Sequence, residues 1–210
     1  TFTAESAKHA AQNGLIGFSV EYRLSNRDDV SPEEAMQDTR DFLRWLRKHA
    51  DSLSVDPNRI IAKGVSAGGH LVSSISVLQE DPQSVPNALI LLSPALDTSD
   101  DYFKSLLRKG QNASALSPLE NLQSGVDMPQ ILILQGRTDD LPPTKYAESF
   151  HAKMKEFGQK SKLVIYENCG HLFTPSHLDD TGWPQSYPKI VKKALERQAE
   201  FYQELGYADK

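Results

Sequence analysis

Short apolar runs alternate along this chain with longer segments in which apolar residues recur every three or four positions. The runs have the length of buried strands, and helical periodicity separates most of them. The predicted strands are Leu15–Tyr22, Ile60–Ala62, Ala88–Leu92, Ile131–Leu134 and Leu163–Tyr166. The predicted helices are Phe2–Asn13, a segment from Ser31 to about Ser52, a segment ending near Leu78, Pro143–Phe157 and Pro188–Leu205. This alternation predicts a single α/β domain over residues 1–210, with a mainly parallel sheet covered by helices on both faces.

One helix start is marked by its own residues. Ser31 is a typical N-cap, Pro32 suits the first turn, and Glu34 completes a capping box. We therefore expect a well-defined helix to begin at Pro32.

The stretch after the second predicted strand combines a tight turn with a serine. Gly64-Val65-Ser66-Ala67-Gly68 follows the strand and opens a helix, which is the G-x-S-x-G pattern of a nucleophile elbow. We expect a turn too sharp for side chains at Gly64 and Gly68, with the Ser66 hydroxyl projecting from the sheet. The helix behind it would direct its positive end at the site. The competing interpretation is a glycine-rich turn with a structural serine.

Two later loops carry the partners that a serine nucleophile needs, a base and an acid that orients it. Asp139 and Asp140 follow one strand, and His171 follows the last. Because catalytic groups of parallel sheets lie at the carboxyl ends of the strands, these loops should meet near Ser66. The order Ser66, Asp139, His171 is the chain order of the α/β-hydrolase triad.

Composition narrows the function classes. The chain has 210 residues, of which 39% are hydrophobic and 24% charged, and a net charge of −5. This acidic balance disfavours nucleic acid and anionic membranes as partners. No apolar run reaches the ~20 residues of a membrane span. The lone Cys169 provides no disulfide framework. Oligomeric state and compartment stay open.

The same motifs resemble those of α/β-hydrolase esterases in the hormone-sensitive-lipase-like and acetyl-esterase group, near bacterial feruloyl and carbohydrate esterases. The resemblance extends from about Phe2 to about Lys193. It rests on the segments Val20–Ser25, Asp56–Ile60, Gly64–His70, Gly136–Pro143 and Tyr166–Phe173. It implies an α/β-hydrolase fold, a small-molecule ester as substrate and no cofactor or metal.

The resemblance also assigns roles. Ser66 would attack the ester, His171 would transfer the proton, Asp139 would orient His171, and the Ala67 backbone N–H would form half of the oxyanion hole. The acid loop departs from the family pattern His-Gly-Thr-x-Asp, because Gln135 stands at the histidine and Arg137 at the threonine. Asp140 would then be a solvated or structural neighbour.

Part of the family pattern is missing. Relatives supply further oxyanion donors from a His-Gly-Gly loop before the first helix, and this chain has no such loop. The predicted strands resemble the fourth to eighth of eight, so the N-terminal strands would be missing and the chain would be a fragment. Alternatively, Leu15–Tyr22 pairs directly with Arg59–Lys63. Loss of the loop should lower catalysis by about two to three orders of magnitude.

Residues 97–126 lack clear periodicity and are rich in Ser, Asn and Pro. Such an insertion within a compact domain is usually a lid or binding loop. Four apolar side chains are candidates to line a substrate pocket, with core packing as the equal alternative; they are Tyr102, Phe103, Leu172 and Phe173.

Other chemistry is less well supported. A metal site from His171, His177, Asp179 and Asp180 matches no familiar ligand spacing. Asp97, Asp100 and Asp101 suit a solvated loop better than a calcium site. We expect Cys169 and His70 to be packed side chains rather than catalytic ones.

Together these observations predict a serine carboxylesterase that cleaves small acyl esters, with acetyl or feruloyl groups on carbohydrate as candidate substrates. Two rivals remain, a prolyl-peptidase-like amide hydrolase and a non-catalytic binding protein with a hydrolase fold.

Overall fold

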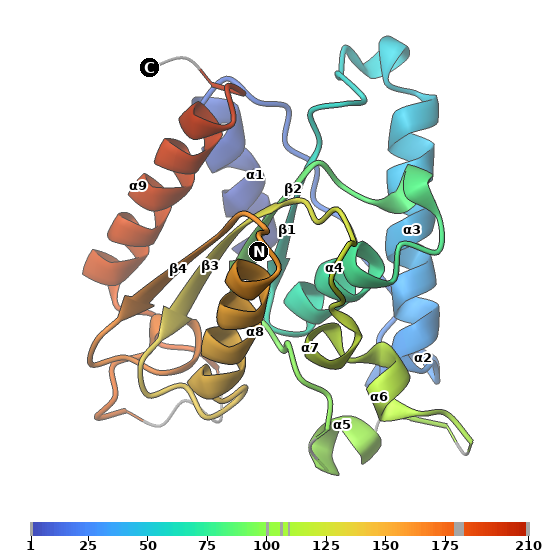
Figure 1. Cartoon of the computed structure of the whole chain (residues 1–210). Coiled ribbons are helices and arrows are strands. Elements are labelled where there is room, and N and C mark those ends of the chain that lie inside the picture. The colour runs from blue at the N-terminus through green and yellow to red at the C-terminus, as the bar shows by residue number, and fades with distance from the viewer. Residues whose placement is uncertain (1, 100, 106, 109, 179–182, 209–210) are drawn as a thin grey trace.

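A parallel sheet of four strands in the order β1-β2-β3-β4 lies at the centre of the molecule (Figure 1). The computed structural model describes residues 2–99, 101–105, 107–108, 110–178 and 183–208. The strands are β1 (Ile61–Val65), β2 (Ala88–Leu92), β3 (Gln130–Gly136) and β4 (Ser161–Tyr166). Each strand pairs in parallel with the next one along the chain, so their carboxyl ends form one rim of the sheet.

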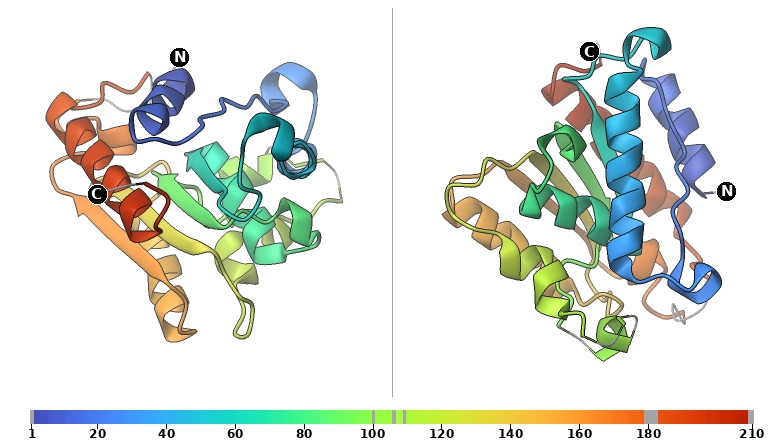
Figure 2. Two further views of the ribbon diagram at one scale, coloured as in Figure 1. Left: turned by 90° about the horizontal axis from the view of Figure 1, so that it is seen from above. Right: turned by 90° about the vertical axis from the view of Figure 1, so that its right-hand side faces the viewer.

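Helices connect and cover the strands. The α-helices are α1 (Phe2–Gln12), α2 (Ser25–Asp28), α3 (Pro32–Lys48), α4 (Ala67–Leu78), α5 (Asp101–Ser105), α6 (Ala113–Leu116), α7 (Pro118–Asn121), α8 (Thr144–Glu156) and α9 (Pro188–Glu204). Short 3₁₀ turns are η1 (Asp51–Leu53), η2 (Pro82–Ser84) and η3 (His171–Phe173). α1 and α9 lie on one face of the sheet, and α4 and α8 lie on the other (Figure 2).

Alternation along β2 divides the core into two layers. Leu89 and Leu91 pack with α4 and α8, whereas Ile90 and Leu92 pack with α9. Because helices cover both faces, all five residues of β2 are buried. The predicted parallel α/β class is thus confirmed.

The predicted capping box is also confirmed. The Ser31 N–H donates to the Glu34 carboxylate at 2.9 Å, and α3 begins at Pro32. α3 then buries Met36 and Leu46 in the cluster that it shares with α4.

The predicted strand Leu15–Tyr22 is wrong, and so is its alternative pairing with β1. Residues 15–24 are extended but belong to no strand, and within the described chain β1 pairs only with β2. A strand needs a neighbour for its backbone hydrogen bonds, and the described residues place none beside this segment. Its apolar side chains therefore stay partly exposed, with Ile16 at 53% and Phe18 at 37%.

The insertion is more regular than predicted. Residues 97–126 contain α5, α6 and α7, which lie toward the rim at the carboxyl ends of the strands (Figure 1). The insertion is attached to α4, because the His70 ring nitrogen Nε2 and the Ser74 hydroxyl both lie 2.9 Å from the Leu116 carbonyl oxygen. Among the described helices, none combines the length and apolarity needed to cross a bilayer.

Candidate active site

Ser66 occupies the turn between β1 and α4 with φ 50° and ψ −114°. Such a backbone is rare for a residue with a side chain and is typically found at functional sites. The Ser66 N–H donates to the Leu92 carbonyl at 2.9 Å, and the Ala95 N–H donates to the Ser66 carbonyl at 3.3 Å. The end of β2 and the residues directly after it thus hold both backbone polar groups of Ser66.

Two glycines within three positions of Ser66, Gly64 and Gly69, make the turn sterically feasible. A Cβ on Gly64 would lie 2.5 Å from the Gly68 carbonyl oxygen, and one on Gly69 would lie 2.7 Å from the Pro94 Cβ. The expectation for Gly68 is wrong, because the nearest atom to its added Cβ is the Tyr22 hydroxyl at 3.9 Å. The first turn of α4 presents Gly69, not Gly68, to the segment after β2.

Ala67 is the first residue of α4. Its N–H has no acceptor within the helix, since the first four amides of any helix lack one. This amide lies next to Ser66 at the positive end of the helix, where it would favour a developing negative charge.

Asp139 and His171 meet at the same rim. His171 Nδ1 lies 3.1 Å from Asp139 Oδ2 and 3.3 Å from Oδ1, and the residues are 1% and 8% exposed. Asp139 also accepts hydrogen bonds from Gln135 Nε2 at 2.9 Å and from the Leu141 N–H at 3.0 Å. These donors stabilise a buried carboxylate facing the imidazole. Asp140, by contrast, is exposed.

The acid and histidine loops are packed directly together. A Cβ on Gly136 would lie 2.2 Å from the Gly170 carbonyl oxygen, so only glycine fits. The Thr138 N–H donates to the Cys169 carbonyl at 3.0 Å. Outside this junction, the exposed Arg137 forms ion pairs with Glu148 and Glu167.

The candidate pocket residues divide by their contacts. Phe103 and Phe173 are buried in the core, where Phe103 packs on the His70 ring and Phe173 packs on the Tyr166 ring. Leu172 is half-buried beside His171. The side chain of Tyr102 lies outside the description, so its assignment stays a prediction.

Cys169 and His70 have the environments of packed side chains. Burial raises the pKa of the Cys169 thiol to about 11, so it is protonated and unreactive near neutral pH. Burial also lowers the pKa of His70 to about 4.

In the described residues, no three His, Cys, Asp or Glu side chains group as metal ligands. Asp100, Asp179 and Asp180, which belong to the weighed metal and calcium sites, lie outside that part.

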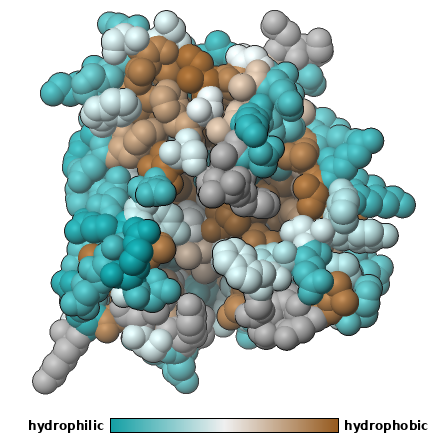
Figure 3. All heavy atoms as spheres, turned by 180° about the vertical axis from the view of Figure 1, so that it is seen from behind, coloured by the Kyte–Doolittle hydropathy of each residue, from teal (hydrophilic) through white to brown (hydrophobic). Residues whose placement is uncertain are grey.

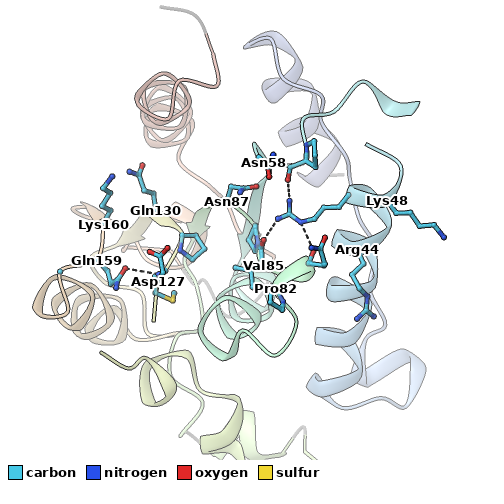
Figure 4. Close-up of a pocket in the computed structure, with 17 residues that line it drawn as sticks. Arg44, Lys48, Asn58, Pro82, Val85, Asn87, Asp127, Gln130, Gln159 and Lys160 are labelled. Atoms are coloured by element: carbon cyan, nitrogen blue, oxygen red, sulfur yellow. Dashed lines mark hydrogen bonds between the residues drawn. The ribbon is translucent and has the colours of Figure 1, made fainter. Parts of the chain in front are cut away.

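A polar groove of about 1040 Å³ lies at the opposite rim of the sheet, where Asn87, Gln130 and Lys160 lie at or just before the starts of their strands (Figure 4). Arg47 already donates to the carbonyls of Pro57, Gln83 and Val85. The groove is remote from the Asp139–His171 pair and does not contribute to this site.

The family model described as BD-FAE matches residues 1–106, half of the chain. This chain belongs to the BD-FAE family. The assignment agrees with the predicted resemblance to α/β-hydrolase esterases.

Several relatives of this BD-FAE chain are named as ester hydrolases. A probable carboxylic ester hydrolase, LipM, from Mycobacterium tuberculosis is 27% identical over 181 residues, which cover 75% of this chain and 41% of LipM. An acetylxylan esterase from Xylanibacter ruminicola is 28% identical over 77% of this chain and 35% of its own length. The chain therefore spans less than half of these relatives.

The fold is similar to that of a solved esterase. Esterase 2 of Thermogutta terrifontis, in its propionate-bound structure, has 29% identity and a TM-score of 0.80, with 98% of this chain and 78% of that chain covered. The α/β-hydrolase fold is thereby confirmed for this BD-FAE member.

Two residues of the site were missed by sequence reasoning. Gln135 was noted only as a departure from the family pattern, yet its amide binds the Asp139 carboxylate. No sequence pattern singled out Ser93, yet its hydroxyl contacts the histidine loop. The position of Gln135 at the end of β3, four residues before Asp139, was the available signal.

Proposed function

We propose that this chain carries the catalytic groups of a serine carboxylesterase that hydrolyses small acyl esters through an acyl-enzyme. The observation that carries the proposal is the buried Asp139–His171 pair at 3.1 Å, at the same rim as the strained Ser66 turn. The esterase names of the relatives support the same reaction class.

The chemistry follows from the assigned roles. Ser66 Oγ attacks the ester carbonyl carbon while His171 Nε2 takes the hydroxyl proton. The oxyanion that forms accepts a hydrogen bond from the Ala67 N–H. His171 then gives its proton to the departing alkoxide, and an acyl ester on Ser66 remains. Water attacks this ester by the same route and releases the acid. Asp139 keeps the imidazole in the Nδ1–H form and stabilises its cation.

We further propose acetyl esters of carbohydrates as the preferred substrates, by analogy with the acetylxylan esterase among the relatives. Feruloyl esters are the second candidate. Release of acetate from acetylated xylan, compared with release of ferulate from a feruloyl arabinoside, ranks the two.

Two measurements on the purified chain test the reaction class. Hydrolysis of p-nitrophenyl acetate should be abolished by Ser66→Ala and retained by Ser76→Ala, a control that also removes a buried serine hydroxyl. Paraoxon, an organophosphate that reacts with activated serines, should modify the peptide that contains Ser66. Unchanged turnover in Ser66→Ala contradicts the proposal. Faster cleavage of a matched peptide amide than of the ester supports the amide hydrolase. Absence of both turnover and labelling supports the non-catalytic binding protein.

A further inference from the structure

Ser93 is a fully buried serine that directly follows β2, with φ 44°. Its N–H donates to the Leu134 carbonyl at 2.9 Å, which continues the sheet pairing by one residue. Its hydroxyl oxygen accepts a hydrogen bond from the Leu172 N–H at 3.1 Å. Ser93 thus connects the end of β2 to the amide directly after His171.

The loop that carries His171 needs such a contact. Leu172 and Phe173 both have positive φ, at 48° and 66°, which is uncommon for residues with side chains and costs on the order of 1 to 3 kcal/mol each. Surrounding structure must hold such residues in place. Several hydrogen bonds of the loop connect its own residues, such as Gly170 N–H to Thr174 O at 2.7 Å. The Ser93 hydroxyl reaches it from the centre of the sheet.

The residue before Ser93 is bonded to the serine turn. The Leu92 carbonyl accepts from the Ser66 N–H, and the Ala95 N–H donates back to the Ser66 carbonyl. The segment 92–95 therefore binds the Ser66 turn by its backbone and the His171 loop by the Ser93 side chain. It is a short link between the two loops, and the separation of these loops decides whether a proton can pass between Ser66 and His171.

We propose that Ser93 is a positioning residue, whose hydroxyl holds the His171 loop in a fixed position relative to the Ser66 turn and Asp139. It does not touch the reacting atoms and acts through the Leu172 amide. The kinetic consequence rests on the proposed esterase function, whereas the orientation of His171 can be measured without turnover.

Removal of the hydroxyl leaves the Leu172 N–H without its acceptor and allows the strained loop to relax. A displacement near 1 Å at a catalytic group can cost about 100-fold in rate. We expect kcat to fall about 10- to 100-fold while KM changes less than about threefold, because bound substrate contacts stay in place.

A matched pair of variants separates this role from backbone strain. Ser93→Ala and Ser93→Gly both remove the acceptor, but only glycine accepts φ 44° without strain. The two variants should differ in thermal stability yet lose similar activity. Ser76→Ala is the control, because Ser76 is equally buried and its hydroxyl donates to the Val72 carbonyl within the same helix, α4.

Long-range ¹H–¹⁵N NMR of the His171 ring provides the decisive readout. The unmodified protein and Ser76→Ala should hold the neutral ring as the Nδ1–H tautomer facing Asp139. Both Ser93 variants should show a mixture of tautomers. Ser93 variants with the same tautomer as the unmodified protein would overturn the proposal, whatever their kinetics. Inactivity of the unmodified protein would count against the esterase function and leave this NMR result decisive for Ser93.

Discussion

At the scale of single residues, the site depends on how one buried carboxylate is satisfied. Asp139 accepts from Gln135, Leu141 and His171, and Gln135 is itself fully buried. Among the described residues, the Gln135 Oε1 atom has no hydrogen-bond partner. The orientation of the Gln135 amide that directs its N–H group to the Asp139 carboxylate thus leaves the amide oxygen unsatisfied.

This arrangement predicts an asymmetric response to two similar substitutions. Gln135→Met removes a donor to a charged acceptor and should lower the free energy of unfolding by about 1.5 to 3 kcal/mol. Gln198→Met is the matched control, because Gln198 is also buried and its Oε1 has no partner in the described part of the chain, but its Nε2 donates to the neutral Ala194 carbonyl. It should lose only about 0.5 to 1.5 kcal/mol. Equal losses in urea denaturation would contradict the assignment of a charged partner.

The two motif glycines of the Ser66 turn should also respond differently. Gly64→Ala would place a Cβ 2.5 Å from a carbonyl oxygen that cannot move without shifting α4. We expect a loss of about 2 kcal/mol or more, as for overpacking against backbone. The Cβ of Gly68→Ala meets an ordinary contact with the Tyr22 hydroxyl at 3.9 Å, so the change within a helix should be neutral or stabilising by about 1 kcal/mol. Thermal unfolding of both variants measures the difference, and a destabilised Gly68→Ala would be the contrary result.

Sequence reasoning succeeded where the signal was local. The capping box of α3, the turn at Ser66 and the placement of Asp139 and His171 after strands depend on residues a few positions apart. It could not find the contact of Ser93 with Leu172, because those residues are 79 positions apart and nothing in either segment indicates the other.

At the scale of elements, the same limit explains the error at residues 15–22. β-branched and aromatic residues favour an extended backbone locally, but a strand exists only if a neighbour supplies its hydrogen bonds. The other apolar runs became strands because each lies beside another in the described sheet. The helices of the insertion were not predicted, because their apolar residues show no periodicity. α6 and α7 are single turns capped by Asn112 and Ser117, too short to produce a periodic pattern.

The attachment of the insertion to α4 predicts a pH-dependent stability. The pKa of His70 is lowered to about 4 by burial, against 6.5 for the exposed group. Between these values the unfolded chain binds a proton that the folded chain excludes, so stability falls as pH drops from about 6.5 to about 4. The shift corresponds to a loss on the order of 3 kcal/mol.

The variant His70→Gln isolates this contribution. Glutamine keeps an N–H donor for the Leu116 carbonyl but does not titrate, so its stability should depend less on pH over the same range. Other histidines with lowered pKa values, His9 and His151, are common to both proteins and cancel in the difference. Parallel pH profiles for the two proteins would show that His70 does not contribute.

At the scale of the whole molecule, β1 is the edge of the described sheet, and apolar side chains are exposed near it. Ile16, Phe18 and Val20 lie on the extended segment, and Trp45 on α3 is 45% exposed. Phe18 and Trp45 both pack on Phe42, so the exposed rings form one cluster. Figure 3 shows apolar residues gathered on this face of the molecule. An open strand edge beside exposed apolar groups favours association.

The purified chain should therefore bind the dye ANS and associate as its concentration rises. The double variant Ile16→Ser/Phe18→Ser should reduce both effects. Trp183→Ser is the control, because Trp183 is 93% exposed but lies elsewhere in the chain, just before the loop leading to α9. Light scattering coupled to size-exclusion chromatography measures association. An equal reduction by the control would assign the effect to general hydrophobicity.

The backbone of Ser66 bears on how such a protein can be improved. A residue held at φ 50° and ψ −114° makes the folded state less stable than an unstrained turn would. Selection for stability of the folded state alone would favour glycine at position 66. Selection for the proposed esterase activity would oppose glycine there. Engineers who seek heat resistance should accordingly seek gains far from this turn, because replacement of Ser66 itself would remove the proposed nucleophile.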